Sequence, residues 1–276
     1  MRFTVSHETL YRYTVPVGFA PHVLRLNPRR EGHLLHSRQL VVDPWPAGWF
    51  EELDPYGNAI TRVVFAGAYA LLRIDSRFEL TTLQPPPLPW DDGLPPLPWA
   101  SLAGDGLDAY RQAAFFEPAV AAFAHELAAQ AGYRPLPFLN ILGQTLYTRC
   151  DRHIRVEGEA QTPGYTLATW RGACRDLSVL FLAACRSLGL AGRFVSGYQA
   201  EADTPDGQRH LHAWPEIFLP GHGWRGWDPT HGIPVTDGHV PLCAAPDQAA
   251  TMPVEGGFYA NGVTVTLDYS VRIATG

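Results

Sequence analysis

The sequence has 276 residues, of which 46% are hydrophobic, 12% aromatic and 17% charged, and 21 basic against 27 acidic residues give a net charge of −6 at pH 7. This composition supports a hydrophobic core and excludes an intrinsically disordered chain. The acidic balance argues against a nucleic-acid binder that depends on phosphate contacts. The length favours two domains.

The chain shows no signal for membranes or for an oxidising compartment. No stretch approaches the ~20 apolar residues that span a bilayer, and the N-terminus lacks the apolar core and cleavage site of a signal peptide. The cysteines are too few for a disulfide framework in a chain of this length and are expected to be reduced thiols: Cys150, Cys174, Cys185 and Cys243. We therefore expect a cytoplasmic protein without membrane or nucleic-acid partners.

Residues 1–83 predict an N-terminal antiparallel β-sandwich domain. The first segment alternates, and its residues of one parity are suited to a half-buried strand: Phe3, Val5, Thr9, Tyr11 and Tyr13. Strand-length segments follow at short spacing, separated by turn sequences such as Asp54-Pro55-Tyr56-Gly57-Asn58.

Residues 84–104 predict a linker or strap. The segment Gln84–Trp99 reads QPPPLPWDDGLPPLPW. Its density of proline excludes a helix or a central strand.

Residues 105–276 predict an α+β domain. Apolar residues recur at helical spacing from Pro118 to about Gly132, from Pro135 to about His153, and from near Cys174 to Gly189. Strand-like segments then follow to the end: GRFVSGYQ, HLHAWPEIFL, GWRGWDP and GFYANGVTVTLDYSVRI. Helices followed by an antiparallel sheet define the α+β class.

Cys174 is the strongest candidate nucleophile among the cysteines. It stands where the third helix begins, after Gly172, and the positive end of a helix dipole stabilises a thiolate. Asp176, in the first turn, is expected to serve the dipole rather than the chemistry. Cys185 lies mid-helix among apolar residues and is expected to be buried.

A histidine and a carboxylate are expected to face this thiol. The turn around Gly221 folds two strands antiparallel and brings the start of one near the end of the next, where Asp228 lies. A cysteine nucleophile needs an imidazole to take its proton and a carboxylate to orient that ring. The spacing leaves two candidates for the base, His210 and His212.

Four motifs in this half, in this order, resemble the bacterial transglutaminase-like superfamily, whose members are often described as candidate cysteine proteases. They are Gly172-x-Cys174-Arg-Asp, Arg186-x-Leu-Gly-Leu-x-x-Arg193-Phe-Val-Ser-Gly-Tyr198, His212-Ala-Trp214-x-Glu216 and Gly223-Trp-x-x-Trp-Asp228-Pro-Thr230. The N-terminal half is similar to the β-rich region that accompanies such domains, through His7-x-Thr9-x-Tyr11-x-Tyr13, Leu24-Arg25-Leu26-x-Pro28-Arg29 and Asp54-x-x-Gly57-Asn58.

The resemblance implies that Cys174 is the nucleophile, His212 the general base and Asp228 the orienting carboxylate. It also implies a papain-like arrangement, with the helix that carries the cysteine packed on the sheet that carries the other two. Departures at Leu177, Ser178 and Phe194 affect the expected substrate preference and not the triad.

The expected reaction is acyl transfer through a thioester on amide bonds of peptides or proteins, with hydrolysis favoured over amine transfer. The backbone N–H of Cys174 is expected to bind the oxyanion, with Trp170, Gln144 and Asn140 as candidates for a second donor. Trp214 and Gly172 are candidates for contact with substrate.

Three alternatives remain open. One is a true transglutaminase, although the chain contains no lysine with which to cross-link itself. Another is a non-catalytic peptide-binding module. A zinc site at Cys150-x-x-His153 is disfavoured because no second pair with matching spacing follows, and neither a metal nor another cofactor is expected.

His222, His231 and His239 are expected to be exposed in loops. The sequence leaves the oligomeric state open.

Overall fold

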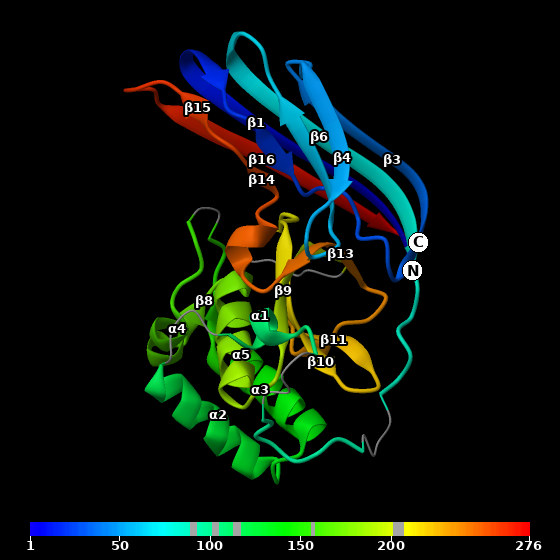
Figure 1. Cartoon of the computed structure of the whole chain (residues 1–276), viewed down its shortest axis with the longest axis vertical. Coiled ribbons are helices and arrows are strands. Elements are labelled where there is room, and N and C mark those ends of the chain that lie inside the picture. Colours follow the sequence, from blue (N-terminus) through cyan, green and yellow to red (C-terminus); the bar gives the residue numbers. More distant parts are fainter. Residues whose placement is uncertain (89–92, 101–104, 113–116, 156–157, 201–206) are drawn as a thin grey trace.

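The computed structural model describes residues 1–88, 93–100, 105–112, 117–155, 158–200 and 207–276. It confirms the α+β class: an antiparallel β-sandwich lies at one end, and helices packed against an antiparallel sheet lie at the other (Figure 1).

The sandwich starts with β1 (Arg2–Phe19), whose alternation matches the sequence pattern. Phe3 and Val5 are buried while Arg2 and Thr4 are exposed. The two sheets share one hydrophobic core. One sheet contains β1, β6 (Ala68–Thr82), β3 (His33–Asp43) and, from the end of the chain, β15 (Phe258–Tyr259) and β16 (Val265–Thr275); the other contains β14 (Val254–Glu255), β2 (His22–Leu24), β5 (Ala59–Val64) and β4 (Gly48–Leu53).

The strands at the end of the chain belong to the N-terminal sandwich. The sequence pattern instead predicts them as part of the domain of residues 105–276. β16 pairs with β1 from Phe3↔Thr275 to Tyr13↔Val265, and β14 pairs with β2. The sequence of β16 shows that it is a strand but not which strand it pairs with. β16 pairs with the edge of β1, which lies more than two hundred residues earlier in the chain, so the pairing cannot be inferred from the residues near β16.

The helical part follows the predicted pattern closely, although α3 ends several residues before the expected limit near His153. Pro118 and Pro135 each stand in the first turn, where the missing N–H of proline costs no hydrogen bond. The short α1 and α4 were not expected from periodicity. The helices are α1 (Asp108–Arg111), α2 (Pro118–Gln130), α3 (Pro135–Arg149), α4 (Pro163–Thr169) and α5 (Cys174–Ser187), with a 3-10 turn, η1 (Gln248–Thr251).

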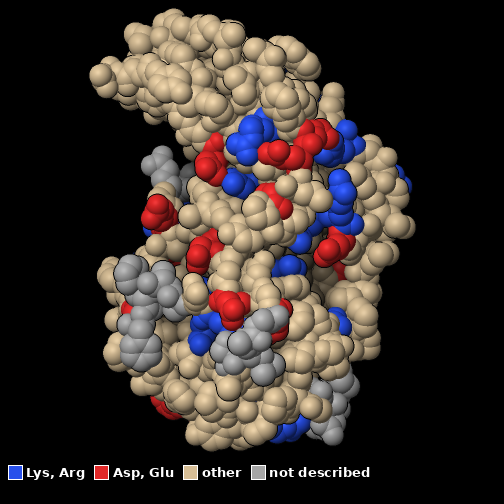
Figure 2. Space-filling model, viewed as in Figure 1, with Lys and Arg blue, Asp and Glu red and all other residues tan. Residues whose placement is uncertain are grey.

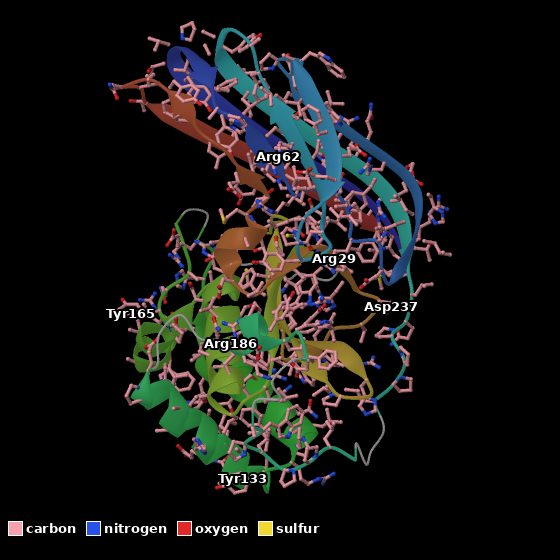
Figure 3. All side chains as sticks on the ribbon, in the orientation of Figure 1. Arg29, Arg62, Tyr133, Tyr165, Arg186 and Asp237 are labelled. Carbon is pink, nitrogen blue, oxygen red and sulfur yellow. The ribbon has the colours of Figure 1, made fainter. Side chains whose placement is uncertain are left out.

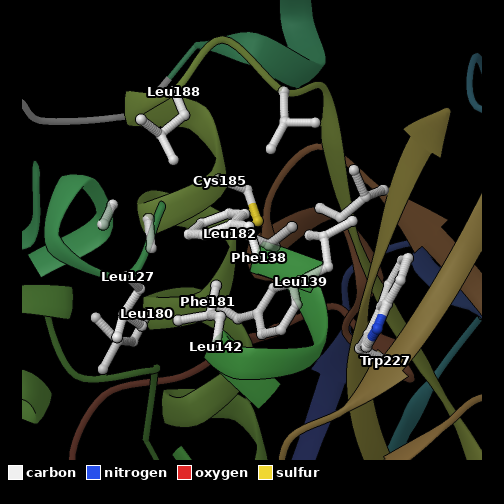
Figure 4. Close-up of a cluster of buried hydrophobic side chains, with 14 of the residues drawn as sticks. Leu127, Phe138, Leu139, Leu142, Leu180, Phe181, Leu182, Cys185, Leu188 and Trp227 are labelled. Atoms are coloured by element: carbon white, nitrogen blue, oxygen red, sulfur yellow. The ribbon is translucent and has the colours of Figure 1, made fainter. Parts of the chain in front are cut away.

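Helix α5 is the centre of the second core. Its apolar face packs on the sheet through Phe181 and Leu182, and α2 and α3 cover its other side (Figure 4). This burial fixes the position of the N-terminal end of α5. The sheet runs in the order β12 (Ile233–Pro234), β11 (Gly223–Asp228), β10 (His212–Leu219), β9 (Gly192–Gln199) and β13 (His239–Ala245), and a small parallel pair joins β7 (Asp151–Arg152) to β8 (Arg171–Gly172).

The described part of the proline-rich strap lies against the helical core. Leu97 is buried there and its N–H donates to the carbonyl of Tyr133 at 2.8 Å. The N–H of Trp99 donates to the carbonyl of Leu188 at 2.9 Å. Residues 89–92 and 101–104 of the strap lie outside the described residues.

Polar contacts join the sandwich to the sheet that packs on α5, and residues of the N-terminal motifs supply them. Asn58 donates from Nδ2 to the carbonyl of Ala244 at 2.9 Å and accepts from the N–H of Ala244 at 2.8 Å. Arg29, which lies at this junction in Figure 3, donates its N–H to the carbonyl of Pro241 and its guanidinium to Asn58. His7 of β1 and Tyr198 of β9 are joined by a 2.7 Å hydrogen bond. The junction is thus built from buried polar pairs, which fix orientation as well as distance.

Candidate active site

Cys174 is the first residue of α5, as the sequence predicts, and its side chain is partly exposed. The helix start is held by Asp176, whose Oδ2 accepts the N–H of Ala173 at 2.7 Å. Oδ1 of the same fully buried carboxylate accepts from Arg155 at 2.6 Å and from the N–H of Gln161 at 2.8 Å. Asp176 therefore caps the helix and also ties down the loop before it, a larger role than the expected interaction with the dipole.

Gly172 is required by the helix itself. A Cβ at this position would lie 2.9 Å from Cβ of Asp176 and 3.0 Å from Cδ1 of Leu177, closer than ordinary packing allows. The close approach expected from a substrate is made instead by the first turn of α5. Gly172 thus allows the first turn of α5, which begins at Cys174, to pack closely against the preceding backbone.

The hairpin of β10 and β11 brings His212 and Asp228 together. Nε2 of His212 donates to Oδ2 of Asp228 at 2.8 Å, and both side chains are buried. Because Nε2 is occupied, Nδ1 is the ring nitrogen left for the Cys174 thiol, which lies close enough to the ring to raise its pKa. His210, the competing candidate, instead pairs through Nδ1 with the hydroxyl of Tyr269 at 2.7 Å.

The charge on Asp228 controls the protonation of His212. Burial alone would lower the pKa of His212, but the charge and hydrogen bond of Asp228 and the contact with Cys174 outweigh it and raise the pKa to about 10. The neighbouring imidazoles in turn hold the pKa of Asp228 well below its usual range, despite burial. At neutral pH this arrangement holds a protonated imidazole beside the thiol.

Two further histidines donate to Asp228, which corrects the expectation that His231 and His239 are exposed in loops. Nδ1 of His231 lies 2.8 Å and Nε2 of His239 lies 3.2 Å from Oδ2 of Asp228. His239 is buried at the start of β13, and its Nδ1 accepts the N–H of Thr236, so its Nε2 carries the proton. Oδ1 of Asp228 accepts from the backbone N–H groups of Thr230 and His231. The contact of His239 had no local signal in the sequence, because it depends on the pairing of β13 with β9, whereas His231 reaches Asp228 within the turn that follows β11, three residues away.

The ligand atoms of His212, Asp228 and His231 lie within 4.8 Å of one another, a spacing that a metal ion also needs. The ring nitrogens that face Asp228 carry the protons of the hydrogen bonds, so an ion would have to displace them. Cys150 and His153, the pair of the zinc alternative, belong to no such cluster within the described part of the chain.

The side chains expected to supply a second oxyanion donor make their contacts away from Cys174. Oδ1 of Asn140 accepts from Nε1 of Trp227 at 3.0 Å, and Nε2 of Gln144 donates to the carbonyl of Gly232. Trp170 caps α4 in a left-handed conformation with φ 51°, and the guanidinium of Arg149 lies 3.7 Å from the centre of its ring. Asn140, Gln144 and Trp170 are not among the described residues that line the cavity beside Cys174.

Trp214 differs from its expected role in substrate contact. Its side chain is 0% exposed and packs against the rings of His212 and His239, with centroid separations of 6.0 and 5.1 Å. It therefore supports the base from the core side of the sheet and has no surface for a substrate.

The other cysteines are buried thiols, as expected. Burial raises the pKa of Cys150 to about 11 and that of Cys243 to about 12, and it raises the pKa of Cys185 well above the usual value. A protonated thiol is a poor nucleophile. The protein therefore contains one partly exposed cysteine beside an imidazole, and three that are held in the neutral form.

Cys174 and His212 open onto a cavity of about 960 Å³ that lies between the two domains. The catalytic part lines it with Arg155, Arg175 and the loop around Asp151, and the sandwich lines it with β1 and β16. The volume is in the range of sites that hold ligands larger than a single amino acid.

The fold is that of a transglutaminase-like protein: residues 142–229 match the transglutaminase-like superfamily and residues 3–81 match the bacterial transglutaminase-like N-terminal region. Along the chain, the match to the superfamily core follows the match to the bacterial N-terminal region. The similarity thus covers both the helix-and-sheet part and the sandwich.

Relatives with the same extent are known from mycobacteria. An uncharacterized protein of Mycobacterium tuberculosis is 28% identical over 294 residues, which covers 99% of this chain and 92% of the relative. One of Mycobacterium leprae is 26% identical and covers 99% and 98%. A crystal structure from Cytophaga hutchinsonii, named "Putative Cysteine Protease", has a TM-score of 0.74 at 17% identity and covers 99% of this chain and 90% of that one. Among the described residues, no helix is long and apolar enough to cross a membrane.

Proposed function

We propose that this protein is a thiol-dependent enzyme that cleaves amide bonds of peptides or proteins through a thioester on Cys174. The observation that carries the proposal is the arrangement of His212, whose Nε2 is held 2.8 Å from Asp228 while its ring lies close enough to Cys174, in the same cavity, for the thiol to raise its pKa. The match to the transglutaminase-like superfamily supports the same chemistry.

In the proposed first step, the thiolate of Cys174 attacks the carbonyl carbon of the amide. A carbon–sulfur bond forms, the carbon–nitrogen bond breaks, and Nδ1 of His212 gives its proton to the leaving amine. In the second step, water attacks the thioester carbonyl and His212 takes a proton from it; the carbon–sulfur bond breaks, the carboxylic acid leaves, and the thiolate of Cys174 beside protonated His212 is restored. Asp228 stays ionised throughout and keeps the ring in this orientation.

The backbone N–H of Cys174 supplies a donor for the oxyanion. It stands at the first position of α5 and makes no hydrogen bond to the described residues. N–H groups of the first helical turn have no partner within the helix and point toward its N-terminal side, where the negative charge develops.

Hydrolysis is favoured over transfer to an amine. The name of the Cytophaga hutchinsonii protein supports this choice, although that similarity lies in the fold. A true transglutaminase would resolve the same thioester with a primary amine, and a binding module would leave Cys174 unreactive. We propose the cytoplasm as the compartment, because the four cysteines are free thiols.

The test measures the alkylation rate of each cysteine by iodoacetamide between pH 5 and 9, read by peptide mass spectrometry. We expect Cys174 to react at least about tenfold faster than Cys150 at pH 7, because a thiolate beside an imidazolium is the reactive form. Cys150 is a matched internal control, since it lines the same cavity but is 6% exposed. A His212→Ala variant should slow the alkylation of Cys174 and leave that of Cys150 unchanged.

A peptide mixture incubated with and without a fluorescent primary amine then separates hydrolysis from transfer. Cys174→Ala should abolish either product while the melting temperature is preserved. Turnover that survives in Cys174→Ala contradicts the proposal. A Cys174 that reacts no faster than Cys150 favours the binding module.

A further inference from the structure

The cavity beside Cys174 has two unlike walls. The catalytic part contributes charged side chains, including Arg152, Arg155 and Glu159. The opposite wall comes from the sandwich, and β1 and β16 contribute no charged side chain to the described lining: His7, Thr9, Tyr11, Leu267 and Tyr269.

Strand register explains why this wall is uncharged. In the β1–β16 ladder Thr9 is opposite Tyr269 and Tyr11 is opposite Leu267, so these side chains share one face of the sheet. The residues of the other parity face away, and there Arg12 and Asp268 form an exposed ion pair at 3.6 Å. Charge is thus sorted to the outer face and excluded from the cavity face.

Two titratable groups of this wall, His7 and Tyr11, are neutral at physiological pH. Burial lowers the pKa of His7 to about 4 and raises the pKa of Tyr11 to about 12. The lobe that carries the ends of these strands also shows no charged side chain on the face seen at the top of Figure 2, in contrast to the surface where the domains meet. A neutral, largely apolar wall favours an apolar ligand group, since a charged one would lose hydration without a partner.

This wall is fixed relative to the catalytic base. The segment that leads into β10 pairs with β16 through a bridge between Arg209 and Val271, and His210 is hydrogen-bonded to Tyr269. His212 follows two residues later. A group held against the wall is therefore held at a defined position relative to His212 and Cys174.

We propose that Tyr11, Leu267 and Tyr269 form a subsite that binds an apolar or aromatic side chain of the peptide substrate, next to the amide that Cys174 attacks. This inference rests on the function proposed above and adds a substrate class to it. The N-terminal sandwich then selects the substrate, and the transglutaminase-like core performs the reaction. Leu267 is 39% exposed, which leaves apolar surface for a ligand to cover.

The test uses N-iodoacetyl dipeptide amides, so no natural substrate is needed. The thiolate of Cys174 displaces iodide: a sulfur–carbon bond forms, the carbon–iodine bond breaks and iodide leaves. The reagents are iodoacetyl-Phe-Gly-amide, iodoacetyl-Gly-Phe-amide and iodoacetyl-Gly-Gly-amide, with iodoacetamide as the measure of intrinsic thiolate reactivity. We expect at least one Phe reagent to alkylate Cys174 about tenfold faster than the Gly-Gly reagent, as partial burial of an aromatic side chain would give.

Matched variants locate the selectivity. Tyr11→Ala and Leu267→Ala should each bring the ratio of Phe to Gly-Gly rates close to one while the iodoacetamide rate stays within about twofold of the wild type. Tyr259→Ala and Leu35→Ala make the same changes at positions of the same sheet that are 73% and 48% exposed and outside the described lining. These controls should retain the ratio.

A wild-type ratio near one, or a ratio that survives in both Tyr11→Ala and Leu267→Ala, overturns the subsite and leaves the proposed function intact. A Cys174 that iodoacetamide alkylates no faster than the other cysteines overturns the proposed function, and the subsite with it. The rate with iodoacetamide therefore distinguishes failure of the subsite from failure of the proposed function.

Discussion

Two buried histidines line the same cavity and carry opposite charge states. His7 comes from the sandwich and His212 from the catalytic sheet, and both are less than one-tenth exposed. The pKa of His7 is lowered to about 4 by burial, whereas that of His212 is raised to about 10 even though burial acts on it in the same direction as on His7.

The difference lies in the partners. His7 contacts two hydroxyl groups, Tyr198 at 2.7 Å and Thr9 at 3.3 Å, and neither offers a full negative charge. His212 contacts the carboxylate of Asp228 at 2.8 Å. The buried carboxylate of Asp75 also raises the pKa of His7, but burial outweighs it, whereas the direct contact with Asp228 helps to reverse the effect of burial at His212. The comparison indicates that the contact with Asp228, and not the extent of burial, determines whether His212 is protonated at neutral pH.

The largest effect is expected from Asp228→Asn, which removes the charge and nearly preserves the shape. Burial should then lower the pKa of His212 below 6.5, and alkylation of Cys174 by iodoacetamide at pH 7 should fall by on the order of a hundredfold, since the imidazolium is lost. The protonation of His212, followed by NMR of the ring nitrogens, checks the cause directly.

Asp268→Asn is the matched control, because this carboxylate is 68% exposed on the outer face of β16. It should leave both readouts unchanged. A ring of His212 that stays protonated at pH 7 in Asp228→Asn contradicts the role given to the carboxylate.

A smaller effect, on stability, is expected from His7→Gln. Unfolded His7 takes up a proton below about pH 6.5 while folded His7 stays neutral to about pH 4, so the stability of the wild type falls as the pH drops through this interval. The contribution is about 2 kcal/mol by pH 5. Denaturant unfolding at pH 7.5, 6.5, 5.5 and 5 should show a shallower decline in His7→Gln than in the wild type. Equal slopes would mean that His7 is protonated in the folded protein.

The smallest effect is expected at His239, which donates one of several hydrogen bonds to Asp228. His239→Leu removes that donor, and the alkylation rate of Cys174 should fall about fivefold, as the loss of one neutral hydrogen bond gives. His239→Gln supplies an amide N–H and should recover most of the rate. His36→Leu, on the exposed strand β3, is the control. A loss that His239→Gln does not rescue would assign His239 to packing alone.

Local patterns predicted the parts of the site that depend on neighbouring residues. Cys174 at a helix start follows from helical periodicity, and the meeting of His212 with Asp228 follows from one hairpin turn. The same reasoning missed His239, because its strand contains Pro241 and pairs with β9 across forty residues of sequence. It also assigned β16 to the wrong sheet, since alternation reports a strand but not its partner. The cavity could not be predicted at all, because its walls come from opposite ends of the chain.

The position of β16 has a consequence for the order in which the protein is made. β1 leaves the ribosome long before its neighbour β16, since more than two hundred residues separate them; the backbones of Arg2 and Gly276 close the pair with hydrogen bonds of 3.0 and 3.1 Å (Figure 1). One edge of β1 therefore stays without its partner strand until the helices and the second sheet have been translated. Since Leu267 and Tyr269 are translated with β16, Cys174 is made before the wall that we propose selects the substrate. A chain interrupted before β16 would therefore contain the proposed nucleophile and lack the proposed subsite.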